Sequence, residues 1–329
     1  MKNSFAVSSE YDRFGRWIDE VARREDLPHL YRDYPIDFSV QRLVLKVPRD
    51  ITRRNATPEM DLYDHLIIVG QDQLTVLSRR LGRPSIEGSP ATNMDDGRGY
   101  NVVDIKFADV VAIRDALNLL SGRLTISTSE GTPVKVAYNG SAADVVGRLV
   151  GMLREVTSTK PASPVGAAIF AAGGPLARPA AASEQGPVDP FLATAFLEAH
   201  IANPRLSAWA THGSRRLAPD VAGLQGTVQR LKHSLSPMTL HGALFAADEA
   251  AMDIFGRHSW LMRGRIPTYS RSHLVIPFGA PDFLDLAPHP LYPDVIVATI
   301  GAGKWRQALP VPRDSVAEQL LREAASKVS

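Results

Sequence analysis

Arginine side chains gather at two places in the sequence and are the groups best suited to binding chemistry. The first cluster comprises Arg79, Arg80 and Arg83, and the second comprises Arg257, Trp260, Arg263, Arg265, Tyr269 and Arg271. A planar guanidinium offers paired donors that match a phosphate or a carboxylate, and aromatic faces among the arginines can add stacking or contact with a membrane interface. The second cluster is therefore the candidate binding site, with a solvated surface held by ion pairs as the alternative.

Other motifs that could carry chemistry are incomplete. The string GAGKW at residues 301–305 lacks the first glycine of a phosphate loop and the Ser or Thr that follows its lysine, so it predicts a hairpin turn. The nine histidines form no metal-ligand motif; the nearest grouping is Asp61, Asp64 and His65, for which a surface or capping role is favoured. No G-x-S-x-G elbow is present. The sequence thus predicts no catalytic residue, no metal and no cofactor.

Composition narrows the class of protein. The chain has 37 Lys and Arg against 35 Asp and Glu, so it lacks the overall positive field that steers nucleic acid, and no nucleic-acid partner is expected. The absence of cysteine excludes disulfides and thiolate chemistry. The opening residues, MKNSFAVSSEYDRFGRW, have no apolar run of the length that a secretory signal needs. We therefore expect a cytoplasmic protein.

The first half of the chain is predicted to be mostly β-strand between two helices. Residues 9–24 carry apolar side chains on one helical stripe, and residues 40–47 favour a strand that ends at Pro48. Six short strands then follow, with sequences HLIIVG, QLTVLS, VVDIKF, VVAIRD, RLTISTS and PVKVAY. A capping pattern at Ser141 and Asp144 starts an amphipathic helix, which must bury its single apolar face.

The middle of the chain has the composition of a linker. Residues 157–190 are rich in Ala, Pro, Gly and Ser and lack periodicity, which predicts a flexible connection between domains. Their uncharged stretch, 161–177, is too interrupted by Pro and Gly for a membrane-spanning helix. Asp189 and Pro190 are good first residues for a helix, and residues 221–231 carry the stripe of another.

The order of predicted elements then returns. The string LHGALFAADEAAMDIFGR can be aligned with DHLIIVGQDQLTVLSRR, and LVIPFGAPDFLDL with VVDIKFADVVAIRD. A hairpin around residues 301–304 precedes a second capping box at Ser315 and Glu318. Because both copies end in a hairpin and a helix at similar spacing, a diverged duplication is expected.

Short antiparallel strands followed by one amphipathic helix resemble pleckstrin-homology-like (PH-like) domains of the bacterial type. The residues that carry the resemblance in the first copy are Gly70, Asp72, Leu74, the IKFADVVAI stretch from Ile105, the GRLTIST strand from Gly122 and the helix from Ser141; in the second they are ALFAADEA, LVIPF and the helix after Pro312. The resemblance implies a bent, two-sheet barrel plugged by the helix, a scaffold that binds peptides, lipids or partner proteins.

The predicted fold class is therefore α+β, with two PH-like antiparallel β-barrels, each closed by a C-terminal helix, and additional helices at the N-terminus and between the modules. The predicted organisation is an N-terminal extension (1–64), module 1 (65–156), a linker (157–190), a helical segment (191–239) and module 2 (240–329). Burial inside the barrels is expected for Val145, Leu149 and Met152 in the first helix and for Val316 and Leu320 in the second.

The leading functional hypothesis is a non-enzymatic binding or scaffold protein that acts through an unidentified protein partner, with its oligomeric state open. Two alternatives remain. One is an enzyme whose active site lies between the modules, because residues distant in sequence can converge there. The other is peripheral binding to anionic membrane lipids through Arg257, Arg263 and Arg265 around Trp260.

Overall fold

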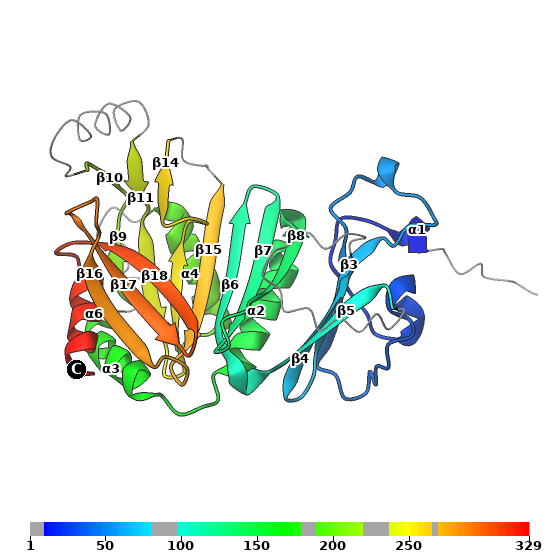
Figure 1. Cartoon of the computed structure of the whole chain (residues 1–329), viewed down its shortest axis with the longest axis horizontal. Coiled ribbons are helices and arrows are strands. Elements are labelled where there is room, and N and C mark those ends of the chain that lie inside the picture. Colours follow the sequence, from blue (N-terminus) through cyan, green and yellow to red (C-terminus); the bar gives the residue numbers. More distant parts are fainter. Residues whose placement is uncertain (1–9, 81–97, 179–188, 220–236, 265–268, 329) are drawn as a thin grey trace, which may run out of the picture.

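The computed structural model describes residues 10–80, 98–178, 189–219, 237–264 and 269–328, and shows antiparallel sheets side by side along an elongated molecule (Figure 1). The N-terminal sheet has strands β1 (Asp19–Glu20), β2 (Leu43–Pro48), β3 (Tyr63–Val69), β4 (Gln73–Arg79) and β5 (Tyr100–Lys106), hydrogen-bonded in that order. One face of this sheet packs on the preceding segment through Phe14 and Tyr31, and the other face joins a core shared with later strands.

A seven-stranded sheet forms the centre of the molecule in the order β8-β7-β6-β15-β13-β12-β9. Its strands are β6 (Val110–Asn118), β7 (Ser121–Thr128), β8 (Val134–Asn139), β9 (Ser207–His212), β12 (Ala243–Ala247), β13 (Ala251–Gly256) and β15 (Ser270–Pro277). Strands β6 and β15 pair from Asn118–Ser270 to Ile113–Val275 and join the two halves of the chain.

Two three-stranded sheets complete the fold. The C-terminal sheet has β16 (Phe283–Pro288), β17 (Val295–Ala302) and β18 (Trp305–Pro312), and the small sheet has β10 (Arg215–Leu217), β11 (Met238–Leu240) and β14 (Leu261–Arg263). The GAGKW segment forms the turn from β17 to β18, where Ala302 pairs with Trp305, so the predicted hairpin is confirmed.

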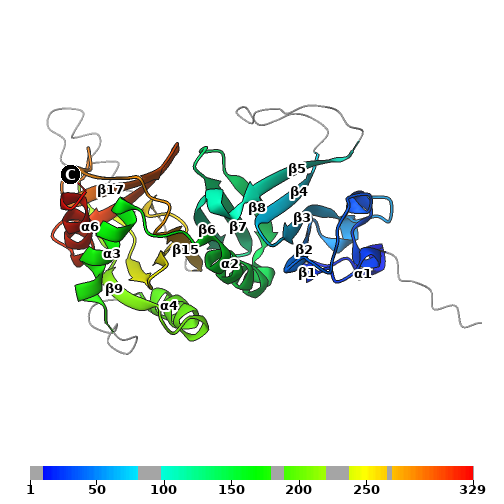
Figure 2. The ribbon, with the colours of Figure 1, turned by 90° about the horizontal axis from the view of Figure 1, so that it is seen from below.

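The α-helices are α1 (Glu10–Arg13), α2 (Ala143–Thr157), α3 (Pro164–Gly173), α4 (Pro190–Ala202) and α6 (Val316–Ser326). Short 3-10 segments are η1 (Arg24–Asp26), η2 (His29–Tyr31), η3 (Arg53–Asn55), η4 (Phe107–Asp109), η5 (Gly140–Ala142) and η6 (Gly174–Leu176). Helices α2 and α4 lie on the same side of the seven-stranded sheet (Figure 2). None of the described helices is long and apolar enough to cross a membrane.

The C-terminal sheet packs on the opposite side of the seven-stranded sheet, together with α3 and α6. Ile254 of β13 and Ile276 of β15 share a core with Ile296 of β17, Leu309 of β18 and Leu320 of α6. The same core includes Trp209 and Ala210 of β9 and, at the other side, Val111 and Ala112 at the start of β6. The described residues of β7 and β8, and those of β6 after Ala112, contribute nothing to it.

The prediction of two closed barrels is wrong. Every sheet formed by the described strands is open, and the described chain consists mostly of antiparallel strands with few helices. Strand β6 pairs with β7 along one edge and with β15 along the other, so neither edge is left to pair with β5 and close a barrel. The same pairing makes one sheet out of strands from both predicted modules.

The order of elements nevertheless recurs within these open sheets. In the first half of the chain, four successively paired strands (β2–β5) are followed by three further strands (β6–β8) and the helix α2. In the second half, four successively paired strands (β9, β12, β13 and β15) are followed by three further strands (β16–β18) and the helix α6. A diverged duplication stays a prediction that this order favours.

Several local predictions need correction. The N-terminal helix ends at Arg13 rather than continuing to residue 24, and the predicted linker contains α3, whose Val165 and Ile169 are buried. The helix predicted at 221–231 lies outside the described residues.

The helix faces were predicted more accurately. Leu149 and Leu320 are buried as expected, and Val145 and Met152 are partly buried against the same core as Leu149. Val316 is 39% exposed, because it is the first residue of α6 and points away from the sheet cores. The predicted capping pair Ser315 and Glu318 is present.

Candidate functional site

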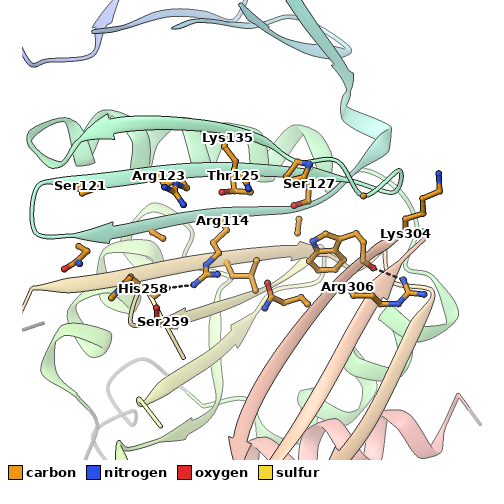
Figure 3. Close-up of a pocket in the computed structure, with 18 residues that line it drawn as sticks. Arg114, Ser121, Arg123, Thr125, Ser127, Lys135, His258, Ser259, Lys304 and Arg306 are labelled. Carbon is orange, nitrogen blue, oxygen red and sulfur yellow. Dashed lines mark hydrogen bonds between the residues drawn. The ribbon is translucent and has the colours of Figure 1, made fainter. Parts of the chain in front are cut away.

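A groove of about 790 Å³ lies where the C-terminal sheet stops covering β6, β7 and β8 (Figure 3). Its basic and polar lining comprises Arg114, Asn118, Ser121, Arg123, Thr125, Ser127, Lys135, His258, Ser259, Lys304, Arg306 and Gln307. Small or apolar residues complete the lining: Ala112, Ala116, Gly131, Pro133, Leu274 and Trp305. None of the described residues that line the groove is Asp or Glu.

Strand alternation places the polar groups of the groove. Successive side chains of a strand point to opposite faces, so every second residue of β7 from Ser121 to Ser127 lines the groove. The intervening Leu124 and Ile126 are buried in the core that contains α2. On β6 the same alternation turns Ala112 and Ala116 into the groove, where their small side chains leave space.

One row of side chains crosses the floor of the groove. Arg114 of β6 is directly opposite Thr125 of β7, and Thr125 is directly opposite Lys135 of β8. Side chains at directly opposed positions lie about 5 Å apart at their Cβ atoms, so a hydroxyl stands between two cations, as Figure 3 shows. A carboxylate or phosphate placed over Thr125 can contact all three side chains.

Arg114 is the most constrained cation of this row. It donates from Nη2 to the carbonyl oxygen of His258 at 2.7 Å, and its guanidinium lies 5.8 Å from the ring centre of Trp260. Its Nε is buried and has no hydrogen-bond partner among the described residues, and burial lowers the pKa of Arg114. No described carboxylate offsets the cost of burying the charge of Arg114, so an anionic ligand would stabilise the charged form of its side chain.

The opposite end of the groove is built from two hairpin turns. Lys304 N, in the β17–β18 turn, donates to Ser129 O in the β7–β8 turn at 2.7 Å. Gly131 and Gly303 have φ angles of +87° and +58°, a conformation that favours glycine, and a Cβ at either position would also crowd the facing turn. Lys304 Nζ pairs with Glu130 at 3.0 Å, although both side chains are largely exposed.

The predicted second cluster lies outside this groove and is not brought together as one site. Arg257 is buried and paired with Asp189, with 2.8 Å between Nε and Oδ2, and its Nη1 donates to Ser270 O at 3.0 Å. Trp260 is 9% exposed and lies beside Arg114, behind the groove. Both residues are therefore packed in the interior, where they stabilise the fold.

The other members of that cluster are nearer the surface. Arg263 is exposed on β14, Tyr269 is 62% exposed, and Arg271 lies 4.0 Å from Glu198 of α4. Arg265 lies outside the described residues. Of the six predicted residues, the structure thus places two in the interior and three at the surface.

The first arginine cluster is engaged within the N-terminal sheet. Arg79 pairs with Asp64 at 2.7 Å, and Arg80 donates from Nε to Asn101 Oδ1 at 2.8 Å. Arg83 lies outside the described residues. Arg79 is thus ion-paired, and Arg80 is hydrogen-bonded to an uncharged amide.

His65 lies on β3 of the N-terminal sheet and is hydrogen-bonded within it. Its Nδ1 lies 2.9 Å from Ser78 Oγ across the β3–β4 pair, and burial lowers the pKa of His65. Within the part of the chain that the structure describes, no group of three or more His, Asp or Glu side chains could hold a metal ion.

The groove residues were not singled out from the sequence, although one signal was present. Alternate positions of RLTISTS and VVAIRDALN are polar or small, which marks an uncovered strand face. What the residues can do together is hold an anion, because cations and hydroxyls converge without a lining carboxylate. In comparisons with known proteins, no family model, curated protein or solved structure matches this chain.

Proposed function

We propose that the protein is a non-enzymatic binding protein that holds an acidic, extended segment of a partner protein in the basic groove. The main observation is charge: Arg114, Arg123, Lys135, Lys304 and Arg306 line one groove, and no described lining residue is acidic. Like charges held close together repel one another, and an acidic segment relieves that repulsion while it gains complementary contacts.

The length of the groove favours an extended ligand. Along β7 it runs from Ser121 to Ser127, which at about 3.3 Å per residue corresponds to roughly 20 Å. An extended peptide of about six residues has this length, whereas a single phosphate group occupies only the width of one cross-strand row. The hydroxyls between the cations can also hydrogen-bond to a peptide backbone.

The lining also favours a peptide over a nucleic acid. Proteins that hold single-stranded nucleic acid offer exposed aromatic rings on which the bases stack. The rings among the described lining residues are those of Trp305, which is 9% exposed, and of His258, which is partly buried. Alanine side chains on the floor instead leave room for the side chains of a peptide.

Fluorescence anisotropy with a short labelled poly-glutamate peptide tests the proposal directly. The glutamate peptide should bind, the same peptide made of glutamine should not, and the affinity should fall as salt is added, because the attraction is between exposed charges. Equal binding of the two peptides, or no binding of the glutamate peptide at low salt, would show that the proposal is wrong.

Variants locate the binding. Arg123→Gln and Lys135→Gln should each weaken glutamate-peptide binding by about three- to fivefold, the effect expected of a partly solvated charge contact. Lys106→Gln is the matched control, because Lys106 is an exposed lysine in the same half of the chain but outside the groove. A control that weakens binding as much as the groove variants would place the peptide elsewhere.

A further inference from the structure

Four large apolar side chains are exposed together at one end of the seven-stranded sheet. Leu119 and Leu120 form the two-residue turn between β6 and β7 and are 59% and 58% exposed. Tyr269, which precedes β15, is 62% exposed, and Phe191, at the start of α4, is 44% exposed. We call these four residues the tip patch.

Contacts within the tip patch hold it in one arrangement. Leu119 N donates to Tyr269 O at 2.8 Å, and the Tyr269 and Phe191 rings meet edge to face with 6.0 Å between their centres. Behind the turn, Gly140 N donates to Leu120 O at 2.7 Å. The apolar side chains are therefore displayed on a fixed backbone and do not depend on a ligand for their placement.

The backbone of the turn makes the presence of leucine unexpected. Leu119 has a φ angle of +55°, in the left-handed region where Gly and Asn are favoured and a large side chain is strained. Two-residue hairpin turns are normally built from such small or polar residues. An exposed leucine at this position is unfavourable both for the backbone conformation and for solubility. This indicates that its side chain makes a contact with another molecule.

Basic side chains beside the tip patch favour binding to an anionic surface. Arg123 is exposed on β7 three residues after Leu120, and Arg271 follows Tyr269 by two residues on β15. Three carboxylates lie nearby: Asp189 is paired with buried Arg257, Glu198 is 4.0 Å from Arg271, and buried Asp115, which accepts a hydrogen bond from the Tyr138 hydroxyl, also attracts Arg271. Arg123 has no carboxylate within ion-pair distance among the described residues. Arg123 is therefore the cation that supplies most of the free positive charge beside the patch.

The size of the tip patch argues against a protein partner. About half of each large side chain is exposed, which gives on the order of 400 Å² of apolar surface for the four residues. A stable protein interface buries about 800 Å² on each partner. A few apolar side chains at a protruding turn with basic residues beside them are instead sufficient for shallow insertion into a bilayer.

We propose that the tip patch inserts into the interfacial layer of an anionic phospholipid bilayer and attaches the protein peripherally. The inference does not rest on the function of the basic groove. Leu119 and Leu120 contribute apolar insertion, the Tyr269 ring lies at the interface, and Arg123 contacts lipid headgroups. This differs from the attachment through Trp260 considered from the sequence, because Trp260 is buried.

Vesicle co-sedimentation tests the proposal with the full chain. The wild-type protein should sediment with vesicles of equal parts phosphatidylserine and phosphatidylcholine, and much less with phosphatidylcholine alone. Leu119→Asn should weaken the apparent vesicle affinity about tenfold, because one inserted leucine is lost. Asn also suits a positive φ angle, so this variant should unfold at the same temperature as the wild type or a higher one.

Val40→Ser is the matched control, since Val40 is 47% exposed but lies beside the N-terminal sheet. It should bind vesicles like the wild type. The proposal is wrong if the wild type fails to sediment with the anionic vesicles, or if Leu119→Asn sediments as well as it does. It is also wrong if the wild type forms dimers that Leu119→Asn dissociates while neither protein binds vesicles, because the patch is then a protein contact.

Discussion

Arg154 of α2 binds Asp253 of β13 and thereby connects the two halves of the chain. The Nη2–Oδ2 distance is 2.8 Å, Nε lies 3.0 Å from the same oxygen, and Asp253 is 1% exposed. Nη1 of Arg154 also donates to Asp248 at 2.8 Å, and His273 Nε2 lies 2.7 Å from Asp253. The helix of the first half is thus held on strands of the second by a buried charge network.

We expect Arg154→Met to destabilise the protein by about 3–5 kcal/mol, the cost of leaving a buried charge without its partner. Arg148→Met is the matched control, because Arg148 is exposed on the same helix, and it should change stability by less than about 0.5 kcal/mol. Denaturant unfolding measures both variants. Equal midpoints for the two would show that the network adds nothing to stability.

His212 should make the protein sensitive to mild acid. Burial lowers the pKa of His212 to about 4, whereas an unfolded histidine has a pKa of about 6.5. Between these values the unfolded chain takes up a proton that the folded chain does not, so the free energy of unfolding falls as the pH drops through this window. The loss from His212 is on the order of 3 kcal/mol.

Other histidines with lowered pKa values, such as His241 and His65, act in the same direction. The contribution of His212 is therefore measured as the difference between the wild type and a His212 variant. Between pH 7 and pH 4, the free energy of unfolding of His212→Gln should fall by about 2–3 kcal/mol less than that of the wild type. Chemical denaturation at several pH values gives both curves. Parallel curves would contradict the assignment.

The parts of the fold that follow from local signals could be predicted. Ser315 accepts from Glu318 N, and Asp189 with Pro190 starts α4, because caps act within a few residues. The helix predicted from Ser141 begins as α2 at Ala143, after a short 3-10 turn. Nothing local marks the β6–β15 pairing, so the joined sheet could not be predicted and the closed barrels were expected instead.

The predicted linker failed for a different physical reason. Small residues suggest a flexible chain, yet they also let a helix approach strands closely. A Cβ on Gly166 would lie 1.9 Å from Phe278 O, and one on Gly173 would lie 2.0 Å from the Trp209 ring. The candidate groove was missed because its cations come from four strands and one turn that only the tertiary structure brings together.

This close packing makes Gly166 sensitive to substitution. Gly166→Ala should destabilise the protein by more than about 2 kcal/mol, since the clash is with backbone that cannot rotate away. In α2, a Cβ on Gly147 meets nothing within 4 Å, so Gly147→Ala should stabilise the protein by about 0.5–1 kcal/mol. Thermal unfolding separates the two. A neutral Gly166→Ala would show that α3 is not docked tightly.

Thr125 gives the most local test of the groove. It lies between Arg114 and Lys135 in one cross-strand row, where its hydroxyl can donate to a ligand carboxylate while the cations supply charge. Thr125→Val keeps the shape and the strand preference but removes the hydroxyl, whereas Thr125→Ser keeps the hydroxyl.

We expect Thr125→Val to weaken glutamate-peptide binding by about fivefold, which corresponds to one hydrogen bond of roughly 1 kcal/mol. Thr125→Ser should bind almost as well as the wild type, and both variants should remain folded because Thr125 is only partly buried. Anisotropy titrations at one salt concentration compare the three proteins. Equal affinities for Thr125→Val and the wild type would mean that the peptide does not cross this row, and loss of binding in both variants would point to a disturbed strand.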